Sequence, residues 1–579
     1  MNLIQEAKDS IDALLKAACV KAAAAGTLPE GELSGLVEIP KDTQNGDFAA
    51  NHAMAAARAF HTAPRKIAEA LIANIDLTGS WFSAVEVAGP GFINFRLADR
   101  WYADVLRAVD AEGENYGRSD LGHGQKLMVE FVSANPTGPM HMGNARGGVL
   151  GDALANVLSR AGYDVWREFY VNDAGNQIEK FAKSIQARYI QLIRGEDAAE
   201  LPEDGYHGDD IRELARDFYR QYGDAYLDKP EAECRAVMAR FGLDRNIPRM
   251  KTDLERYGIH YDQWFFESEL HETGYVRDTV DKLERLGFTY EKDGALWLRT
   301  GEILAAVYHR QGRSDADIEK LDLKDDVLRR ANGFYTYFAS DIAYHRNKFE
   351  KRGFDRVINV WGADHHGHVA RLKGALDALG LDGEHRLDVV LMQLVKLMRG
   401  GEIVRMSKRT GKAISLTDLL DEIPVDAARY FFNSKPESPV EFDLDLAVRQ
   451  DSENPVYYVQ YAHARICTLI AALAEEGHPV PGAAAIDMTK LDTPQERELI
   501  KQLAALPEEI VLAARAMDPS GINRYVTELA ARFHRFYTVC RIKDAEPGTL
   551  EARLFLADEV RRVIALSLAV IGVSAPEKM

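Results

Sequence analysis

The sequence contains little cysteine, with only four in 579 residues: Cys19, Cys234, Cys467 and Cys540. None forms a C-x-x-C pair, and none stands at zinc-finger spacing with a histidine. This pattern excludes both a disulfide framework and a cysteine-based zinc site. We therefore expect four reduced, mostly buried thiols, as is usual for a protein of the cytoplasm.

Long apolar runs and a basic start are also missing. No segment approaches the roughly 20 uncharged apolar residues of a membrane span. The first turns carry Glu6, Asp9 and Asp12, whereas a targeting peptide is basic or apolar there. We expect a cytoplasmic protein with no membrane partner.

Positive charge is in deficit, since 71 Lys and Arg face 90 Asp and Glu, giving a net charge of −19. Such a surface does not attract nucleic acid as a whole, so a polyanion would have to bind at local basic patches. Apolar residues make up 46% and charged residues 28%, as in an ordinary globular protein. The length predicts about three to five domains.

The patterns that are present divide the chain into regions. Residues 1–115 mix helical and strand-like stretches, whereas strand–turn–helix–strand order begins at Lys126 and all-helical periodicity at about Pro455. We predict a multidomain α/β protein with an N-terminal α/β domain and a doubly wound, Rossmann-like domain interrupted by a charged helical insertion. The expected bounds are 1–115, 116–400 with the insertion at about 190–290, a basic region at 401–454, and an all-α bundle at 455–579.

The first informative motif is PTGPMHMGNA, residues 136–145, between a strand-like run and a helical segment. Glycine lets the backbone approach a ligand closely, and the following helix N-terminus favours anionic oxygens. His141 and Asn144 add side-chain donors. We predict that this turn holds the triphosphate of ATP, and that His141 and Asn144 stabilise charge developing at the α-phosphorus. The predicted ATP-binding residues here are Pro139, His141, Gly143 and Asn144.

The second motif is a cationic loop, RMSKRTGK, at residues 405–412. Its glycine permits hinge motion and its cations suit a clamp on the departing pyrophosphate. We predict that Met406, Ser407 and Lys408 bind ATP and that Lys408 is also catalytic.

A third motif, GADHHGH at residues 362–368, follows an apolar strand-like run. The carboxyl end of a parallel strand is well placed to hold adenine and ribose, so we predict that Gly362, Asp364 and His365 bind ATP. The i, i+1, i+3 histidine spacing fits a single metal ion poorly, and we expect no metal held by the protein.

The first two motifs together resemble those of class I aminoacyl-tRNA synthetases. Asn144 stands where that class more often has histidine, and Arg405 and Arg409 depart from the K-M-S-K-S signature. Longer stretches resemble the arginyl-tRNA synthetase family in order along essentially the whole chain. They are residues 130–148, 335–345, 454–465 and 572–579.

This resemblance implies roles for further residues. It places Glu130, Tyr337 and Asp341 at the arginine guanidinium, with Ser133 and Asn135 at the α-amino and carboxylate end and His365 also in the pocket. Tyr337 and Asp341 are four apart in a helix-like segment and can face one pocket, and a guanidinium needs carboxylates. The N-terminal domain would hold the tRNA elbow and the helical bundle the anticodon. The implied tRNA-binding residues are Tyr457, Tyr461, Arg465 and Met579.

The implied activity is arginine–tRNA ligation, in which ATP and Mg²⁺ activate L-arginine and the arginyl group passes to the 3′-terminal adenosine of arginine tRNA. The family further implies a monomer that activates arginine only with tRNA bound. Three alternatives stay open: another class I synthetase such as the glutamyl or cysteinyl enzyme, a smaller nucleotidyltransferase, and a catalytically inactive tRNA-binding or regulatory protein. An acidic substrate would need Lys or Arg side chains at the positions where this chain has the carboxylates Glu130 and Asp341.

Overall fold

The computed structural model describes residues 1–393, 395–404, 414–434 and 440–579. Among these residues, no helix combines the length and the apolar character that crossing a membrane requires. The basic motif at 405–412 lies outside the described residues.

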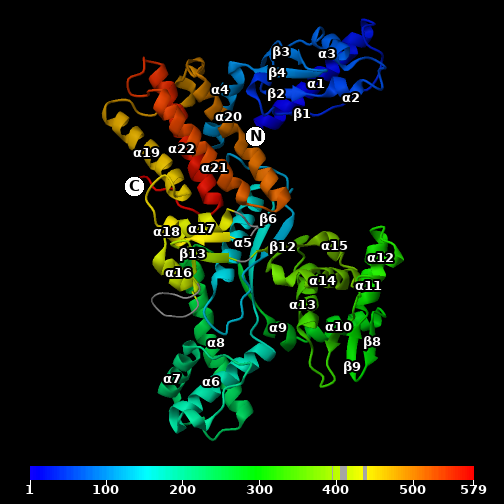
Figure 1. The fold of residues 1–579 in the computed structure, drawn as a ribbon, viewed down its shortest axis with the longest axis vertical. Helices are drawn as coiled ribbons and strands as arrows, with labels where there is room; N and C mark the ends of the chain where they lie inside the picture. Colours follow the sequence, from blue (N-terminus) through cyan, green and yellow to red (C-terminus); the bar gives the residue numbers. More distant parts are fainter. Residues whose placement is uncertain (394, 405–413, 435–439) are drawn as a thin grey trace.

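The N-terminal region is an antiparallel sheet covered by helices, at the top of Figure 1. The sheet order is β1-β2-β4-β3, and α1 begins at a cap in which Asn2 accepts from the Gln5 N–H. Its elements are α1 (Leu3–Ala24), β1 (Val37–Glu38), β2 (Phe48–Ala50), α2 (His52–Ala56), α3 (Pro64–Ile72), β3 (Phe82–Ala88), β4 (Phe92–Leu97) and α4 (Asp99–Glu112).

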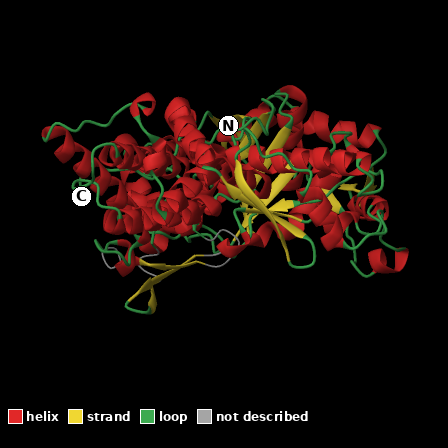
Figure 2. Ribbon diagram, turned by 90° about the horizontal axis from the view of Figure 1, so that it is seen from above, coloured by secondary structure: helices red, strands yellow, loops and turns green. Residues whose placement is uncertain are grey.

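A five-stranded parallel sheet forms the centre of the molecule, with strand order β12-β11-β5-β6-β7. Seen from above in Figure 2, strands lie between helical regions. The order reverses between β5 and β11, so a crevice is expected outside their carboxyl ends. This confirms the predicted doubly wound domain. Its elements are β5 (Lys126–Glu130), α5 (Met142–Arg160), β6 (Asp164–Val171), β7 (Gln263–Phe266), β11 (Arg356–Gly362), α14 (His366–Ala378), α15 (Gly383–Arg386) and β12 (Leu387–Met392).

Two excursions leave this sheet. The first, between β6 and β7, is helical, has its own aromatic core and forms the bottom of Figure 1: α6 (Asn176–Arg194), α7 (Asp209–Tyr222) and α8 (Glu231–Arg256). The sheet resumes at Gln263, so this excursion begins and ends earlier than the expected range of 190–290. The second lies between β7 and β11 and contains α9 (Glu267–Glu272), α10 (Tyr275–Arg285), β8 (Thr289–Lys292), β9 (Ala295–Leu298), α11 (Thr300–Arg310), α12 (Asp315–Glu319), β10 (Asp326–Arg329) and α13 (Tyr337–Arg346).

A small sheet and a helical bundle complete the chain. The sheet region contains β13 (Val395–Arg399), β14 (Glu402–Val404), α16 (Leu416–Glu422), α17 (Val425–Asn433), β15 (Val440–Asp443) and α18 (Leu444–Ala447). The predicted all-α region is confirmed. It consists of α19 (Pro455–Glu475), α20 (Pro494–Ala516), α21 (Ser520–Val539) and α22 (Thr549–Val570).

One buried guanidinium joins these regions. Arg429 of α17 is fully buried and pairs with Asp152 of α5. Its other nitrogens donate to the backbone carbonyls of Tyr257 (3.0 Å) and Ile571 (3.3 Å). A side chain at Gly572 would meet the guanidinium at 1.9 Å, so this close approach requires glycine. Arg429 therefore ties the sheet domain, the helical excursion and the C-terminal tail together.

We expect Arg429→Ala to lower the free energy of unfolding by about 3–5 kcal/mol, because it removes the closer cation of buried Asp152, leaving Arg167 at 3.7 Å, and takes a donor from the carbonyls of Tyr257 and Ile571. Urea and thermal denaturation would measure the loss. The matched control is Arg449→Ala, whose exposed pair with Asp451 (2.9 Å) is worth about 0–1 kcal/mol. Equal losses in the two variants would contradict the assignment of Arg429 as the buried joint.

A second buried group, Glu559 of α22, lies near α4. Within the described residues neither carboxylate oxygen has a hydrogen-bond partner, although the Arg562 guanidinium lies 3.4 Å from Oε1. Burial raises the pKa of Glu559 to about 8, with Arg562 opposing the shift and Asp558 and Asp110 adding to it. The folded protein therefore holds this proton at pH values where an unfolded glutamate has lost it.

The stability that this proton contributes is complete below the unfolded pKa of 4.5 and is lost as pH rises through about 8. We expect Glu559→Gln to remove that decline, so that the variant unfolds at a higher temperature than the parent near pH 9 and at a similar temperature near pH 5. Calorimetry at both pH values measures this. Exposed Glu475→Gln serves as control, and a pH-independent difference for Glu559→Gln would refute the prediction.

Candidate active site

The HMGN turn forms the start of α5, with His141 as its N-cap. The His141 Nδ1 accepts from the Gly143 N–H (3.1 Å), and the Asn144 Oδ1 accepts from the His141 N–H (3.0 Å). Burial lowers the pKa of His141, so its ring is neutral at pH 7 and carries its proton on Nε2. Asn144 thus shapes the turn with its oxygen and keeps its amide N–H₂ available. The turn presents neutral donors beside a helix N-terminus, which suits phosphate oxygens.

The surrounding chain holds this turn from two sides. The Asn246 amide of α8 donates to the Pro136 carbonyl (2.9 Å). The Leu416 N–H donates to the Met140 carbonyl (2.9 Å), and Ser415 forms a β-bridge with His141. The segment that follows the basic motif is therefore anchored beside the HMGN turn. Met406, Ser407 and Lys408 themselves lie outside the described residues.

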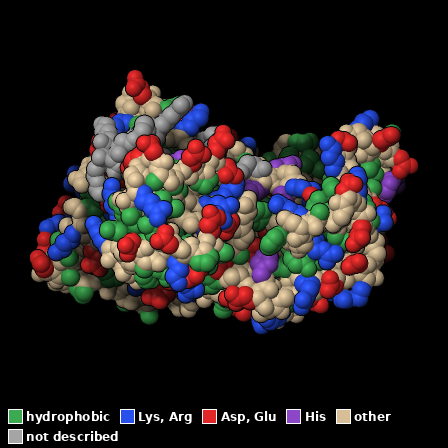
Figure 3. Space-filling view, turned by 90° about the horizontal axis from the view of Figure 1, so that it is seen from below, with side chains coloured by type: hydrophobic (Ala, Val, Ile, Leu, Met, Phe, Trp, Pro, Cys, Tyr) green, Lys and Arg blue, Asp and Glu red, His purple; other side chains and the backbone are tan. Residues whose placement is uncertain are grey.

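Gly362 ends β11 next to β5, on the side of the sheet where the crevice is expected. The ring of His365 follows in a short 3₁₀ turn, 5.8 Å from the ring of Trp361. The Asp364 side chain is not among those described. In the described part of the chain, no group of three or more His, Cys, Asp or Glu side chains is arranged to hold a metal ion. Figure 3 shows histidine side chains beside a hollow in the surface seen from below.

Backbone strain marks the exit from β5. Val132 and Ser133 have φ values of +71° and +43°, a left-handed conformation that a β-branched residue rarely adopts. This bend turns Ser133 back, so that its hydroxyl donates to the Glu130 Oε1 (2.9 Å) and accepts from the Tyr170 N–H (3.3 Å). Such strain concentrates at functional sites. Asn135 lies further along this loop and is exposed.

Glu130 is buried and already has a cation. The Lys348 ammonium, also buried, lies 2.5 Å from the Glu130 Oε2. Burial lowers the pKa of Lys348, and Glu130 and Glu168 oppose this shift. The Lys348 ammonium also donates to Asn359 (3.4 Å), whose amide donates to the His345 Nε2 (2.7 Å). Glu130 thus belongs to a continuous buried network.

Asp341 lies on the first turns of α13, together with Tyr337. The Asp341 Oδ2 is 2.9 Å from the His368 Nε2, and the Tyr337 hydroxyl accepts from the Gln177 N–H (3.3 Å). The phenol of Tyr170 connects the two sides of the pocket. Its burial raises its pKa well above the ordinary value, and the nearby carboxylates of Glu267, Asp341 and Glu130 raise it further.

Glu267 is a functional candidate that the sequence reasoning missed. It is 2% exposed, at the start of α9 directly after β7. Its Oε1 lies 3.3 Å from the His271 Nε2. In the orientation that satisfies both ends of its amide, Asn172 donates to the Glu267 Oε2 (3.0 Å). Its position at the carboxyl end of a parallel strand was an available signal, but β7 was not recognised within the charged helical stretch.

The pairing of these carboxylates is unequal. Glu130 pairs with Lys348, and Glu168 with Arg352, so both have permanent cations. In the described structure, the ionic partners of Asp341 and Glu267 are the imidazoles of His368 and His271. Within the described residues, Asp341 and Glu267 therefore lack a Lys or Arg partner, which suits a cationic ligand.

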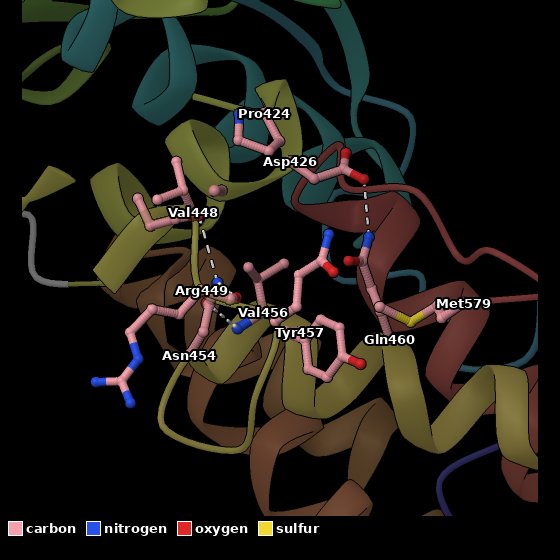
Figure 4. Close-up of a pocket in the computed structure, with 12 residues that line it drawn as sticks. Pro424, Asp426, Val448, Arg449, Asn454, Val456, Tyr457, Gln460 and Met579 are labelled. Atoms are coloured by element: carbon pink, nitrogen blue, oxygen red, sulfur yellow. Dashed lines mark hydrogen bonds between the residues drawn. The ribbon is translucent and has the colours of Figure 1, made fainter. Parts of the chain in front are cut away.

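A separate cavity of 240 Å³ lies between α17, α18 and α19 and the end of the chain (Figure 4). Tyr457 and Met579 line it, and hydrogen bonds from Gln460 to the Ser574 carbonyl (3.0 Å) and from His463 to the Pro576 carbonyl (2.9 Å) tie down the tail. The Tyr457 and Tyr461 rings are parallel, 6.1 Å apart, and Arg465 lies over the Tyr461 ring. The predicted residues Tyr457, Tyr461, Arg465 and Met579 thus lie on one part of the bundle.

Three family models match the chain in order. Residues 6–97 match the arginyl tRNA synthetase N terminal domain, residues 106–441 the catalytic domain of tRNA synthetases class I (R), and residues 459–579 the DALR anticodon binding domain.

Curated relatives match over the full length. The chain is 51% identical over 580 residues to the arginine–tRNA ligase of Acetivibrio thermocellus and 52% identical over 580 residues to that of Caldanaerobacter subterraneus subsp. tengcongensis, with 100% of each chain covered. A putative arginyl-tRNA synthetase structure from Campylobacter jejuni is 31% identical with a TM-score of 0.72, covering 83% of this chain and 100% of that one. Thermus thermophilus arginyl-tRNA synthetase shares the fold, with a TM-score of 0.71 and 21% identity, covering 98% of this chain and 99% of that one.

The pairing of Glu130 with Lys348 predicts a stability pattern. We expect Lys348→Met to cost about 3–5 kcal/mol, because it leaves a buried carboxylate without its cation. Adding Glu130→Gln to this variant should recover much of the loss, since a neutral amide needs no cation.

Denaturation of the two variants measures both effects. Lys229→Met, in the exposed pair with Glu233 (3.0 Å), is the control and should change stability by about 0–1 kcal/mol. A double variant no more stable than Lys348→Met alone would show that charge compensation is not the role of Lys348.

Proposed function

The chain belongs to the arginyl-tRNA synthetase family and is an arginine–tRNA ligase, and on this premise we propose which of its residues bind the substrates and carry the reaction. The arginine carboxylate attacks the α-phosphorus of ATP, giving arginyl-adenylate and pyrophosphate, and a ribose hydroxyl at the 3′ end of arginine tRNA then takes the arginyl group. Neither step needs a nucleophile from the protein. Positioning and charge stabilisation therefore carry the catalysis.

The HMGN turn is proposed to stabilise the transferring phosphate. The Nε2–H of neutral His141, the Asn144 amide and the positive end of the α5 dipole favour phosphate oxygens without a fixed positive charge, while the Gly143 and Asn144 backbone N–H groups cap the turn through the His141 ring. This supports an effect on the transition state rather than on ground-state binding of arginine. Lys408, with Met406 and Ser407, is proposed to hold the pyrophosphate, and the anchoring of Ser415 against His141 supports this. Pro139, Gly143, Gly362, Asp364 and His365 complete the proposed ATP site.

The observation that carries the proposed arginine site is that Asp341 and Glu267 pair with imidazoles in the described structure, whereas Glu130 and Glu168 pair with Lys348 and Arg352. We propose that these two carboxylates bind the guanidinium, with Tyr337 at its edge. A guanidinium offers five donors in a plane and is matched by two carboxylates better than by one. Ser133, Asn135 and His365 are proposed at the amino-acid end. Glu130 is proposed to lie next to the guanidinium and to act mainly through hydrogen bonding, because Lys348 already balances its charge. It also accepts a hydrogen bond from the Ser133 hydroxyl, which fixes the position of Ser133.

The partners follow from the same premise. The cavity beside Tyr457 and Met579 has the size and aromatic lining to take an unstacked base, so we propose that it binds the anticodon loop, with Tyr461 and Arg465 as further contacts. The N-terminal domain is proposed to hold the tRNA elbow. Mg²⁺ is proposed to arrive with ATP, held by phosphate and water oxygens. We further propose that the protein is a monomer and that it resides in the cytoplasm. The four free cysteine thiols support the cytoplasmic location.

Arginine-dependent exchange of pyrophosphate into ATP, with and without arginine tRNA, tests the proposal. We expect exchange only with tRNA. Asp341→Asn should raise KM for arginine roughly 10–100-fold, the cost of losing a hydrogen bond to a charged group. His141→Ala should instead lower kcat about 100-fold or more with little change in that KM.

The exposed Asp382→Asn should behave as the parent and controls for the loss of a surface carboxylate. Exchange without tRNA would contradict only the proposed dependence of arginine activation on bound tRNA. An unchanged arginine KM in Asp341→Asn would overturn the pocket assignment, and no arginine-dependent exchange under either condition would overturn the ligase activity itself.

A further inference from the structure

A line of polar contacts leads from β10 through α14 to Asp341 on α13. The Arg371 guanidinium donates through Nη1 to the Asp326 Oδ1 (2.6 Å) and through Nη2 to the His368 Nδ1 (3.4 Å). The His368 Nε2 then meets the Asp341 Oδ2 (2.9 Å). The far end is fixed as well, because Thr300 donates to the Asp326 Oδ2 (2.9 Å).

The contacts determine the state of the imidazole. A guanidinium has donors and no acceptor, so the Nδ1 that faces Arg371 must offer its lone pair. The single ring proton of neutral His368 then sits on Nε2 and is donated to Asp341. The two contacts therefore fix which ring nitrogen faces Arg371 and which donates to Asp341.

The ring is also fixed sterically. The Phe338 ring lies edge-on at 5.3 Å and the Trp361 ring at 5.6 Å, while the Arg371 Nε donates to the Gly367 carbonyl (3.1 Å). Imidazole orientation and tautomer are thus both determined by groups outside the pocket. In enzymes, such outer contacts tune the groups that touch the substrate.

We propose that His368 is a positioning residue for arginine recognition and that Arg371 fixes the orientation of its ring. This rests on the proposed role of Asp341 at the guanidinium. His368 holds one oxygen of Asp341 and leaves the other oriented for the substrate. Arg371 contacts the opposite ring nitrogen and is itself anchored by Asp326 on β10.

Steady-state exchange kinetics in the presence of tRNA test the positioning role. We expect His368→Ala to raise KM for arginine roughly tenfold or more, with kcat changed about twofold at most, since a hydrogen bond to a charged group is lost from binding rather than chemistry. His368→Gln, which keeps a neutral donor, should restore most of the affinity. The control is His385→Ala, which removes an exposed imidazole from a similar pair with Asp382 (2.7 Å) and should leave KM unchanged.

A double variant tests the role of Arg371. Without its guanidinium, the contact that holds the His368 Nδ1 is lost. Arg371→Met should therefore raise the arginine KM. In the double variant Arg371→Met/His368→Ala this extra rise should vanish relative to His368→Ala alone, because Arg371 acts through His368.

The outcomes separate the two levels of inference. If Asp341→Asn leaves the arginine KM unchanged, the pocket assignment itself fails. If Asp341→Asn raises that KM but His368→Ala does not, the pocket stands and the positioning role is wrong. A loss in His368→Ala that His368→Gln does not rescue, or a rise in the arginine KM from Arg371→Met that persists in the His368→Ala background, would likewise overturn the proposal. Circular dichroism and Tm of each variant identify any that fail to fold.

Discussion

Charge buried at the carboxyl end of the central sheet must be compensated, and this constraint organises the site. A carboxylate removed from water is costly unless it is paired or hydrogen-bonded. Lys348 and Arg352 meet that demand for Glu130 and Glu168 inside the protein. Asp341 and Glu267 contact imidazoles, and Asn172 donates an amide N–H to Glu267. In the proposed arginine site, the substrate guanidinium supplies the cation for these two carboxylates.

The topology explains how residues so far apart in sequence come to share this constraint. Parallel strands bring their carboxyl ends to one edge, so the exits of β5, β7 and β11 deliver Glu130, Glu267 and the turn before His368 to the same side. The helical excursion is held to the turn by Asn246 and to α13 by the Gln177 N–H. The same constraint applies where the sheet domain meets the C-terminal bundle. There the buried Arg429 pairs with Asp152 and donates to the backbone carbonyls of Tyr257 and Ile571.

Much of this was accessible from sequence because local signals coincide with function. The glycine–histidine turn between a strand and a helix predicted the start of α5, and strand–helix alternation predicted the doubly wound sheet. The spacing of Tyr337 and Asp341 correctly predicted that both lie on one helix. Glu267, His368 and Lys348 were not accessible, because their significance depends on neighbours that only the fold brings close, such as Asp341 for His368, 27 positions away, and Glu130 for Lys348, 218 positions away. The strained φ values at Val132 and Ser133 likewise have no local sequence signal, since neither residue is a glycine.

The way the pocket balances charge also bears on selectivity. A pocket whose carboxylates were all paired with Lys or Arg would bind a neutral side chain as readily as a cation. In the proposed site, Asp341 and Glu267 have no Lys or Arg partner among the described residues. A neutral analogue would leave these carboxylates buried without a cation. The free energy lost in this way exceeds the free energy gained from the hydrogen bonds that the analogue could form. Lysine supplies the charge but only as a compact ammonium, which cannot engage two carboxylates in one plane as a guanidinium does. In the proposed site, discrimination depends on which carboxylates lack a Lys or Arg partner and on how rigidly they are held, and that rigidity comes from the residues that contact Asp341 and Glu267 from outside the site.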